Sequence, residues 1–276
     1  MATIGKTRRP VDPEVRGVLH RLAVGEHALE RSAPPPALEE WVEHFWRVRW
    51  NLEGLPAQVQ ETLPHPNVQL VLEPGLAAAY GVHTGRWSRT LEGRGQAFGI
   101  KLRAGALRPF IRHAVSDLAD RSVPLETLFG PDAGALHALL ACAAMEAAVE
   151  LASRFLLARL PALDPQAVLA GRIVDSVADD RELRSVARLA EGCGMSVRAL
   201  QRLFGEYVGA SPKWVINRYR MHEAVARVQA GEPVAWAALA QDLGYFDQAH
   251  FIADFRKLVG RTPADYAKDH AAPSAG

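Results

Sequence analysis

The sequence of 276 residues has 49% hydrophobic and 23% charged residues and a net charge of +1. This length predicts about two domains, since an average domain has roughly 150 residues. The composition is that of an ordinary globular protein that buries a full core. No apolar run reaches the ~18–20 residues of a membrane span, and the first residues lack the apolar stretch of a secretory signal. The two cysteines, Cys142 and Cys193, cannot form a disulfide framework, so we expect a cytoplasmic protein.

The first half of the chain is expected to be rich in β-strands. After a loose first dozen residues, short β-prone runs at 44–50, 59–63 and 68–74 are separated by Gly, Pro and Asn. The glycines of 81–105 predict consecutive hairpins, and a short helical zone is expected near 105–129. We therefore predict a β-rich domain over 1–130.

The character of the sequence changes at Pro131. Segment 132–160 is rich in Ala and Leu and predicts one or two buried helices, and Pro161 and Pro165 bracket a short break after it. The remainder has helical patterning throughout. We expect a helical connector over 131–163, an all-α domain over 164–270 and a disordered tail over 271–276. The predicted fold class is α+β, with two domains.

The all-α segment contains an internal repeat. The intervals from Ala to Gly, from an aromatic residue to Gly and from Gly to Pro are the same in both copies, while the stretch after the first glycine is one residue longer in the second copy. The first copy consists of Ala190, Gly194, Leu200, Phe204, Gly209, Ser211 and Pro212, and the second consists of Ala240, Gly244, Phe251, Phe255, Gly260, Thr262 and Pro263.

Each repeated residue type has a structural reason. An alanine four residues before a glycine lets two helices cross closely, and the glycine favours the left-handed turn that ends a helix. Two residues four apart then face inward on the next helix, and a further glycine ends that helix. Ser-Pro and Thr-Pro supply the N-cap and the first-turn proline of the helix that follows. The repeat predicts two helix-turn-helix units joined by a long helix from Pro212 to Ala230.

The outward faces of the two second helices, about 196–206 and 247–258, decide between a DNA-binding domain and a generic helical bundle. Arg and Gln suit base edges and phosphates, although they are also common on solvated faces. Residues 164–276 include as many acidic as basic residues, fourteen of each, so net charge gives DNA binding no support. The candidates are Ser196 as a cap with Arg198, Gln201 and Arg202 on the first helix, Gln248, Ala249 and Ile252 after the cap Asp247 on the second, and Lys213, Arg218, Arg256, Lys257 and Arg261 for phosphates.

Residues 165–269 resemble the DNA-binding domain of the AraC/XylS family, and LGYFDQAHFIADFRKLVGRTPADY at 243–266 is the most specific part. The resemblance implies seven helices, with the third and sixth as recognition helices on either side of a long central helix. Family members often have Arg where this chain has Ala253, so we expect most sequence discrimination from the first recognition helix. By this resemblance Arg198, Gln201 and Arg202 read bases in one major groove, and Gln248, Ala249, Ile252 and Ala253 face the adjacent groove, about one turn or ~34 Å along the duplex.

The segment over about 25–130 is similar to a sensor-like domain that precedes the DNA-binding domain in a subset of this family. In better-known relatives this domain is a cupin-type barrel that binds a small effector and dimerises, which is an analogy at the level of fold. It implies a small-molecule effector, a homodimer and, for an activator, contact with RNA polymerase. If an apolar pocket exists here, Trp46, Trp87, Arg103 and Arg108 are its ligand-binding candidates. The alternative is that the aromatic residues only fill the core.

The sequence has no recognisable catalytic or metal motif. Its histidines lack the pairing of a metal cupin, and no HExxH, CxxC, P-loop, GxSxG or helix-opening GxGxxG occurs. We expect no enzyme activity, no cofactor and no metal. The predicted function is a transcription regulator that binds double-stranded DNA with sequence specificity. Its rivals are an enzyme with a helical appendage and a helical scaffold with no role on DNA.

Overall fold

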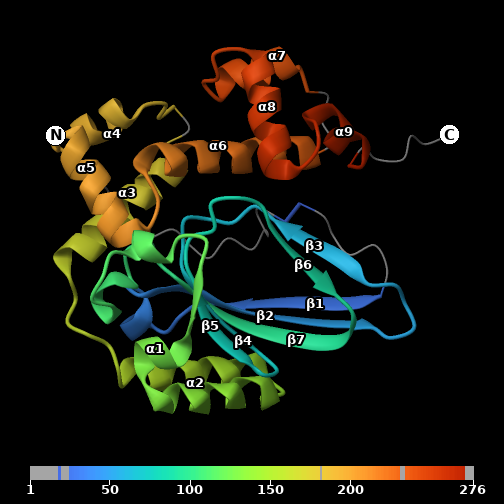
Figure 1. Ribbon diagram of the computed structural model, residues 1–276, viewed down its shortest axis with the longest axis vertical. Coiled ribbons are helices and arrows are strands. Elements are labelled where there is room, and N and C mark those ends of the chain that lie inside the picture. The colour runs from blue at the N-terminus through green and yellow to red at the C-terminus, as the bar shows by residue number, and fades with distance from the viewer. Residues whose placement is uncertain (1–17, 20–24, 181, 231–233, 271–276) are drawn as a thin grey trace.

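Figure 1 shows the computed structural model of the chain, of which residues 18–19, 25–180, 182–230 and 234–270 are described. The two expected loose ends, the first dozen residues and 271–276, lie outside these ranges. A β-rich part is followed by a helical part, as predicted, and the long helix α6, Pro212–Gln229, lies across the β-rich part (Figure 1). None of the described helices is long and apolar enough to cross a membrane.

The β-rich part is built on an antiparallel six-stranded sheet with the order β1-β2-β7-β4-β5-β8. On the longest pair of strands, Trp46 lies opposite Gly99 and Trp50 opposite Gly95. A Cβ at Gly99 or Gly95 would come within 1.9 or 2.1 Å of the indole rings, so glycine lets both rings lie flat on the sheet. The strands are β1 Glu26–Ser32, β2 Val42–Leu52, β4 Gln69–Glu73, β5 Leu76–Tyr80, β7 Gly93–Leu102 and β8 Ser122–Pro124.

Strands β3, Gln58–Thr62, and β6, Trp87–Leu91, form a separate two-stranded sheet. The prediction of consecutive hairpins over 81–105 is therefore wrong, because β6 pairs with β3 whereas β7 pairs with β2 and β4. The chain passes from one sheet to the other between Leu91 and Gly93, which has a φ of 54°. Alternating patterns specify strands but leave their partners open, which explains the error.

The six-stranded sheet buries one face under helices and lines a cavity with the other. Along β2, Phe45 lies in the core, whereas the side chains on either side of it, His44 and Trp46, line the cavity. The core face is covered by a 3-10 segment, Pro131–Ala141, and by α2, Met145–Leu157, so only the second half of the predicted helical segment 132–160 is α-helical.

The predicted helical zone near 105–129 contains short pieces only. These are two 3-10 turns at Arg108–Phe110 and Val115–Leu118, followed by the one-turn helix α1, Leu125–Phe129.

The helical part has seven helices over the described residues, the number that the resemblance implies. The pair α4 and α5, the first unit, lies at one end of α6, and the pair α7 and α8, the second unit, lies at the other end (Figure 1). A π-helical segment, Phe204–Val208, extends α5. The helices other than α6 are α3 Pro165–Asp179, α4 Val186–Gly192, α5 Val197–Leu203, α7 Trp236–Asp242, α8 Gln248–Val259 and α9 Pro263–Lys268.

Helix α6 contributes to two separate cores. Its first half packs through Val215 with α3, α4 and α5, and its second half packs through Val225 with α7, α8 and α9. The β-rich part enters both cores, since Val82 belongs to the first and Leu63 to the second. Both units are therefore fixed to α6 and to the β-rich part by buried apolar contacts.

Candidate nucleic-acid interface

The turns of the two units have the same backbone conformation. Gly194 and Gly244 have φ of 65° and 74°, and in each unit the next amide donates at 2.9 Å to the carbonyl of the alanine four residues before the glycine. Gly209 and Gly260, with φ of 89° and 91°, lie just after the last helical residues, as the repeat predicts.

The helices that follow the turns begin and pack as predicted. Ser196 caps α5 and Asp247 caps α8, because their side-chain oxygens accept hydrogen bonds from the amides of Ala199 and His250 at 3.2 and 2.7 Å. The residues that face inward are fully buried, and they are Leu200, Phe204, Phe251 and Phe255. The opposite faces of α5 and α8 are consequently turned away from the core.

The outward face of α5 carries the polar side chains expected for base recognition. Arg198, Gln201 and Arg202 are all exposed, and Ser196 is exposed at the start of the helix. No other part of the described chain covers these side chains, so the face is accessible to a ligand as large as a duplex. Lys213 is exposed on the first turn of α6.

The outward face of α8 is less polar. Gln248, Ala249 and Ala253 are exposed, whereas Ile252 is half-buried against the second core. The last turn carries Arg256 and Lys257, which are both exposed; these belong with the phosphate candidates. His250 is exposed and lies 3.8 Å from Asp254, so its ring has a neighbouring acceptor on the same helix.

Arg218 is a correction to the sequence-based prediction, because its guanidinium does not face solvent. It is 1% exposed on α6, donates to the carbonyls of Thr84 and Gly85, at 3.2 Å for Gly85, and lies 4.5 Å over the ring of Trp214. Burial lowers its pKa to about 10, against the opposing effect of Asp120. Arg218 therefore links α6 to the β5–β6 loop by buried hydrogen bonds, and a phosphate has no access to its guanidinium.

The same loop also reaches the second unit. Arg86 donates at 3.3 Å to the carbonyl of Val259, the last residue of α8, and pairs with Glu61 of β3 at 2.9 Å. The backbone at Thr84 accepts from Trp214 Nε1 at 3.2 Å on the first half of α6. Through these contacts one short loop of the β-rich part holds the central helix and the end of α8.

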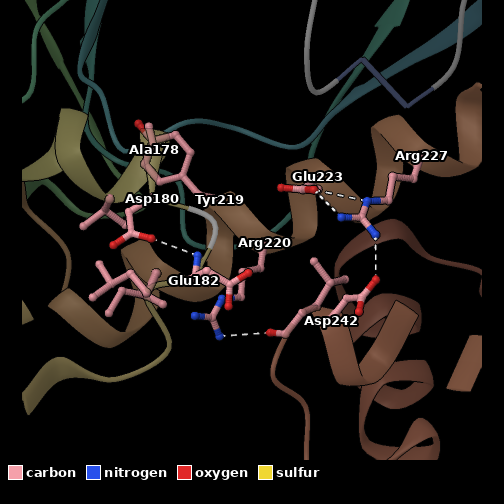
Figure 2. Close-up of a pocket in the computed structure, with 12 residues that line it drawn as sticks. Ala178, Asp180, Glu182, Tyr219, Arg220, Glu223, Arg227 and Asp242 are labelled. Atoms are coloured by element: carbon pink, nitrogen blue, oxygen red, sulfur yellow. Dashed lines mark hydrogen bonds and ion pairs between the residues drawn. The ribbon is translucent and has the colours of Figure 1, made fainter. Parts of the chain in front are cut away.

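Arginines at the junction of the two units fix them to each other (Figure 2). Arg220 of α6 donates at 3.0 Å to the carbonyl of Leu243, and Arg184, just before α4, donates at 3.1 Å to the carbonyl of Asp242. Burial and the charge of Arg184 lower the pKa of Arg220. Arg227 of α6 donates to carboxylates of α6 and α7, at 2.7 Å to Glu223 and 3.1 Å to Asp242. A polar pocket of about 240 Å³ separates these elements.

A cavity of about 1320 Å³ lies on the other face of the six-stranded sheet and is bounded by both parts of the molecule. Three predicted ligand residues line it, namely Trp46, Trp87 and Arg103. The helical part adds Tyr219 from α6 and His270 from the end of α9. Three indoles in the wall, those of β2 and β6, give the cavity large apolar surfaces.

Arg108 is a second correction, because it does not line this cavity. Its guanidinium donates at 2.6 Å to the carboxylate of Glu206 in the helical part and lies 6.0 Å from the centre of the Tyr207 ring. A basic residue next to aromatic residues in the sequence predicted a ligand contact, but a partner almost a hundred residues away engages it instead.

Two ion pairs lie in the cavity wall. Arg89 is paired with Glu73, and Lys101 donates at 2.8 Å to Glu43. Burial opposes the ionisation of Glu43, but Lys101 and His44 together hold its pKa well below the usual value. Over the described residues, no group of three or more His, Cys, Asp or Glu side chains is arranged to hold a metal ion.

Comparisons with known proteins place the helical part in a known class. Residues 189–269 match the family model described as a helix-turn-helix domain, and residues 30–124 match one described as a domain of unknown function. The fold and the two units therefore define a DNA-binding domain of the double helix-turn-helix type. These matches support the predicted resemblance of the helical part to AraC/XylS-type transcription regulators.

The individual relatives match only about a quarter to a third of this chain. The HTH-type transcriptional activator RhaS of Pectobacterium carotovorum is 31% identical over 75 residues, which are 27% of this chain and 26% of that protein. The XylDLEGF operon transcriptional activator 3 of Pseudomonas putida is 33% identical over 99 residues, which are 34% and 29% of the two chains. The match thus spans just over a quarter of each relative.

Two solved structures match this chain over different extents. An AraC-type transcriptional regulator from Chromobacterium violaceum is 24% identical, with a TM-score of 0.33 over 37% of this chain and 91% of that chain. ToxT from Vibrio cholerae is 12% identical, with a TM-score of 0.39 over 88% of this chain and 96% of that chain.

Proposed function

We propose that this protein is a transcription regulator that inserts α5 and α8 into adjacent major grooves of double-stranded DNA. The observation that carries the proposal is the pair of exposed helix faces on two equivalent units, each fixed to one end of α6. A recognition helix needs a free outward face and a rigid support, and a second one on the same support reads a second groove.

The residues of the two faces have different roles in this proposal. Arg198, Gln201 and Arg202 of α5 hydrogen-bond to base edges, for which their side chains carry suitable donors and acceptors. On α8, Gln248 is the polar residue, and the exposed Ala249 and Ala253, with the half-buried Ile252, offer apolar contacts. Phosphates are contacted at the ends of helices by Ser196, Lys213, Arg256 and Lys257, while the buried Arg218 takes no part.

Binding of the full chain to DNA tests the proposal. A duplex is first selected from a random library, and affinity for it is then measured by fluorescence anisotropy over a range of salt concentrations. We expect a preferred sequence and a steep loss of affinity as salt rises, because phosphate contacts release counterions. Failure to select any sequence would contradict the proposal and favour the enzyme or the scaffold.

The variants Arg198→Ala and Arg202→Ala test the assignment of α5. Each is expected to weaken binding by about 1–3 kcal/mol, with relaxed preference at the base pairs that its side chain contacts. Arg154→Ala is the matched control, because Arg154 is an exposed arginine of α2 on the far side of the β-rich part. Equal affinities for all three variants would refute the assignment.

We further propose that a small molecule binds in the 1320 Å³ cavity and modulates DNA binding. Its support is the size of the cavity and the chemistry of its wall, which combines three indoles with many polar and charged side chains. Tyr219 and His270 belong to the helical part, so a bound molecule touches the elements that carry α5 and α8.

We also propose that the protein dimerises and, if it is an activator, that it contacts RNA polymerase, because the family that it resembles suggests both partners.

Thermal unfolding of the full chain with a panel of aromatic metabolites, sugars and organic acids tests the cavity. A molecule present at a hundredfold excess over its Kd should raise Tm by about 5 °C. The rise should shrink in Trp87→Ala and persist in Trp236→Ala, since Trp236 lies on α7 outside the cavity. A rise that survives the loss of the Trp87 ring would refute this location.

A further inference from the structure

The second unit has one residue more than the first between its turn and its helix cap. In the first unit the turn residue Met195 is followed directly by the cap Ser196. In the second unit the equivalent turn residue is Tyr245, since its amide makes the same 2.9 Å hydrogen bond, but the cap is Asp247. The additional residue is therefore Phe246, which has no counterpart in the first unit.

Phe246 is far more exposed than any other large hydrophobic residue of the described chain. Its exposed fraction is 94%, whereas the next such residue, Val59, reaches 54%. The neighbouring Tyr245 turns inward instead, with its ring centre 5.3 Å from that of Phe251. A phenyl ring in water does not give the stabilisation that its burial would give. The stability of the free protein therefore does not explain why position 246 is a phenylalanine.

The position of Phe246 places it at the start of α8, one residue before the N-cap. Recognition helices present their N-terminal residues to base edges in the major groove. Among the exposed side chains at this end of α8, which include those of Gln248, Ala249 and His250, Phe246 is the large apolar one. An apolar side chain at such a place recognises the C5-methyl group of thymine, the one apolar group that the major groove offers.

We propose that Phe246 is a specificity-determining residue that contacts a thymine methyl group in the groove entered by α8. The inference rests on the proposed function and deepens it, since it names the base that the otherwise weakly polar second helix selects. The basic residues Arg256 and Lys257 on the same helix favour a nucleic-acid partner for this surface over a protein partner.

Removal of the methyl group and removal of the phenyl ring together form the test. In the duplex selected by the wild-type full chain, each thymine of the half-site under α8 is replaced in turn by deoxyuridine, which keeps the base pair but lacks the methyl. At one of these positions the wild type should bind about three- to tenfold more weakly. Phe246→Ala should bind the thymine duplex more weakly by a similar factor and should not distinguish deoxyuridine from thymine there. Phe246→Leu, which keeps an apolar side chain, should retain part of the discrimination.

The outcomes separate this inference from the proposed function. Val59→Ala is the control for loss of an exposed apolar side chain and should bind every duplex like the wild type. If Phe246→Ala binds all duplexes with wild-type affinity, or if deoxyuridine weakens both proteins equally, the inference is overturned while DNA binding stands. An unchanged affinity combined with lost transcriptional activation would assign Phe246 to a protein contact and would also overturn it. If the wild type selects no sequence, the proposed function fails, and this inference fails with it.

Discussion

Replacement of Arg218 by methionine tests whether this residue holds the two parts of the molecule together. Methionine keeps most of the apolar length of the side chain and removes its charge and its donors. In the structure the guanidinium is 1% exposed and donates to the carbonyls of Thr84 and Gly85. The variant therefore distinguishes two roles of Arg218. One is a buried link between α6 and the β5–β6 loop, and the other is a contact with DNA phosphates, which is the role that the sequence alone predicts.

The magnitude follows from these contacts. A hydrogen bond from a charged donor contributes about 1.5–3 kcal/mol, and a buried carbonyl that loses its donor costs about 1–3 kcal/mol. The burial that lowers the pKa of Arg218 to about 10 opposes them, and the shift corresponds to about 3 kcal/mol. We therefore expect Arg218→Met to lower the free energy of unfolding by about 2–4 kcal/mol.

Two measurements on the same variant distinguish the roles. Urea unfolding reports the stability, and anisotropy over a salt series reports the phosphate contacts, since each lost contact lowers the slope of log K against log salt by about 0.9. Arg218→Met should be less stable than the wild type, with an unchanged salt slope. Lys213→Met, which changes an exposed residue, should have wild-type stability and a reduced salt slope. Wild-type stability together with a reduced salt slope for Arg218→Met would refute the buried link between α6 and the β5–β6 loop.

Three further predictions follow from other contacts. Phe251→Ala should lower the free energy of unfolding by about 3–5 kcal/mol in urea, because the ring is fully buried in the core of the second unit; a loss under about 1 kcal/mol would contradict its place there. Arg227→Met should weaken binding to duplexes carrying both half-sites more than to one half-site alone, since Arg227 joins α6 to Asp242 of α7; equal losses on both duplexes would show that the junction does not set the spacing. Glu43 has a pKa below its usual value of 4.5, so its ionisation stabilises the fold above pH 4.5 and this contribution is lost as pH falls below it. Glu43→Gln should therefore show a shallower fall in stability below pH 4.5 than the wild type, and parallel acid profiles would be the contrary result.

The helix-turn-helix units could be predicted from the sequence because the signals for them are local. Caps, turn glycines and inward residues lie within a dozen positions of one another, and Ser196, Gly194 and Leu200 all have the predicted structural roles. The exposure of Arg198 on the outward face follows from the same helical period.

The long-range contacts could not be predicted in this way. Arg218 finds its acceptors more than 130 residues earlier in the chain, and Arg108 finds Glu206 almost a hundred residues later. A basic residue near a helix end or an aromatic cluster has the same sequence pattern whether it is exposed or buried. The pairing of β6 with β3 was missed for a similar reason, because alternation reveals a strand without its partner.

The extra residue of the second unit shows an intermediate case. The repeat reveals that the second copy is one residue longer after Gly244, and only the hydrogen bond of Tyr245 identifies Phe246 as the additional residue. The structure also shows that the side chain of this additional residue is exposed, which an alignment of the two copies cannot reveal.

The most direct test of the central claim is a footprint of the full chain on its selected duplex, combined with methylation interference at guanine N7 in the major groove. If α5 and α8 enter adjacent major grooves, we expect two protected patches with interference in two grooves, about one helical turn apart. We also expect Arg198→Ala to lose the interference in one groove only. A single protected groove, or two patches that both persist unchanged in Arg198→Ala, would contradict the insertion of both helices.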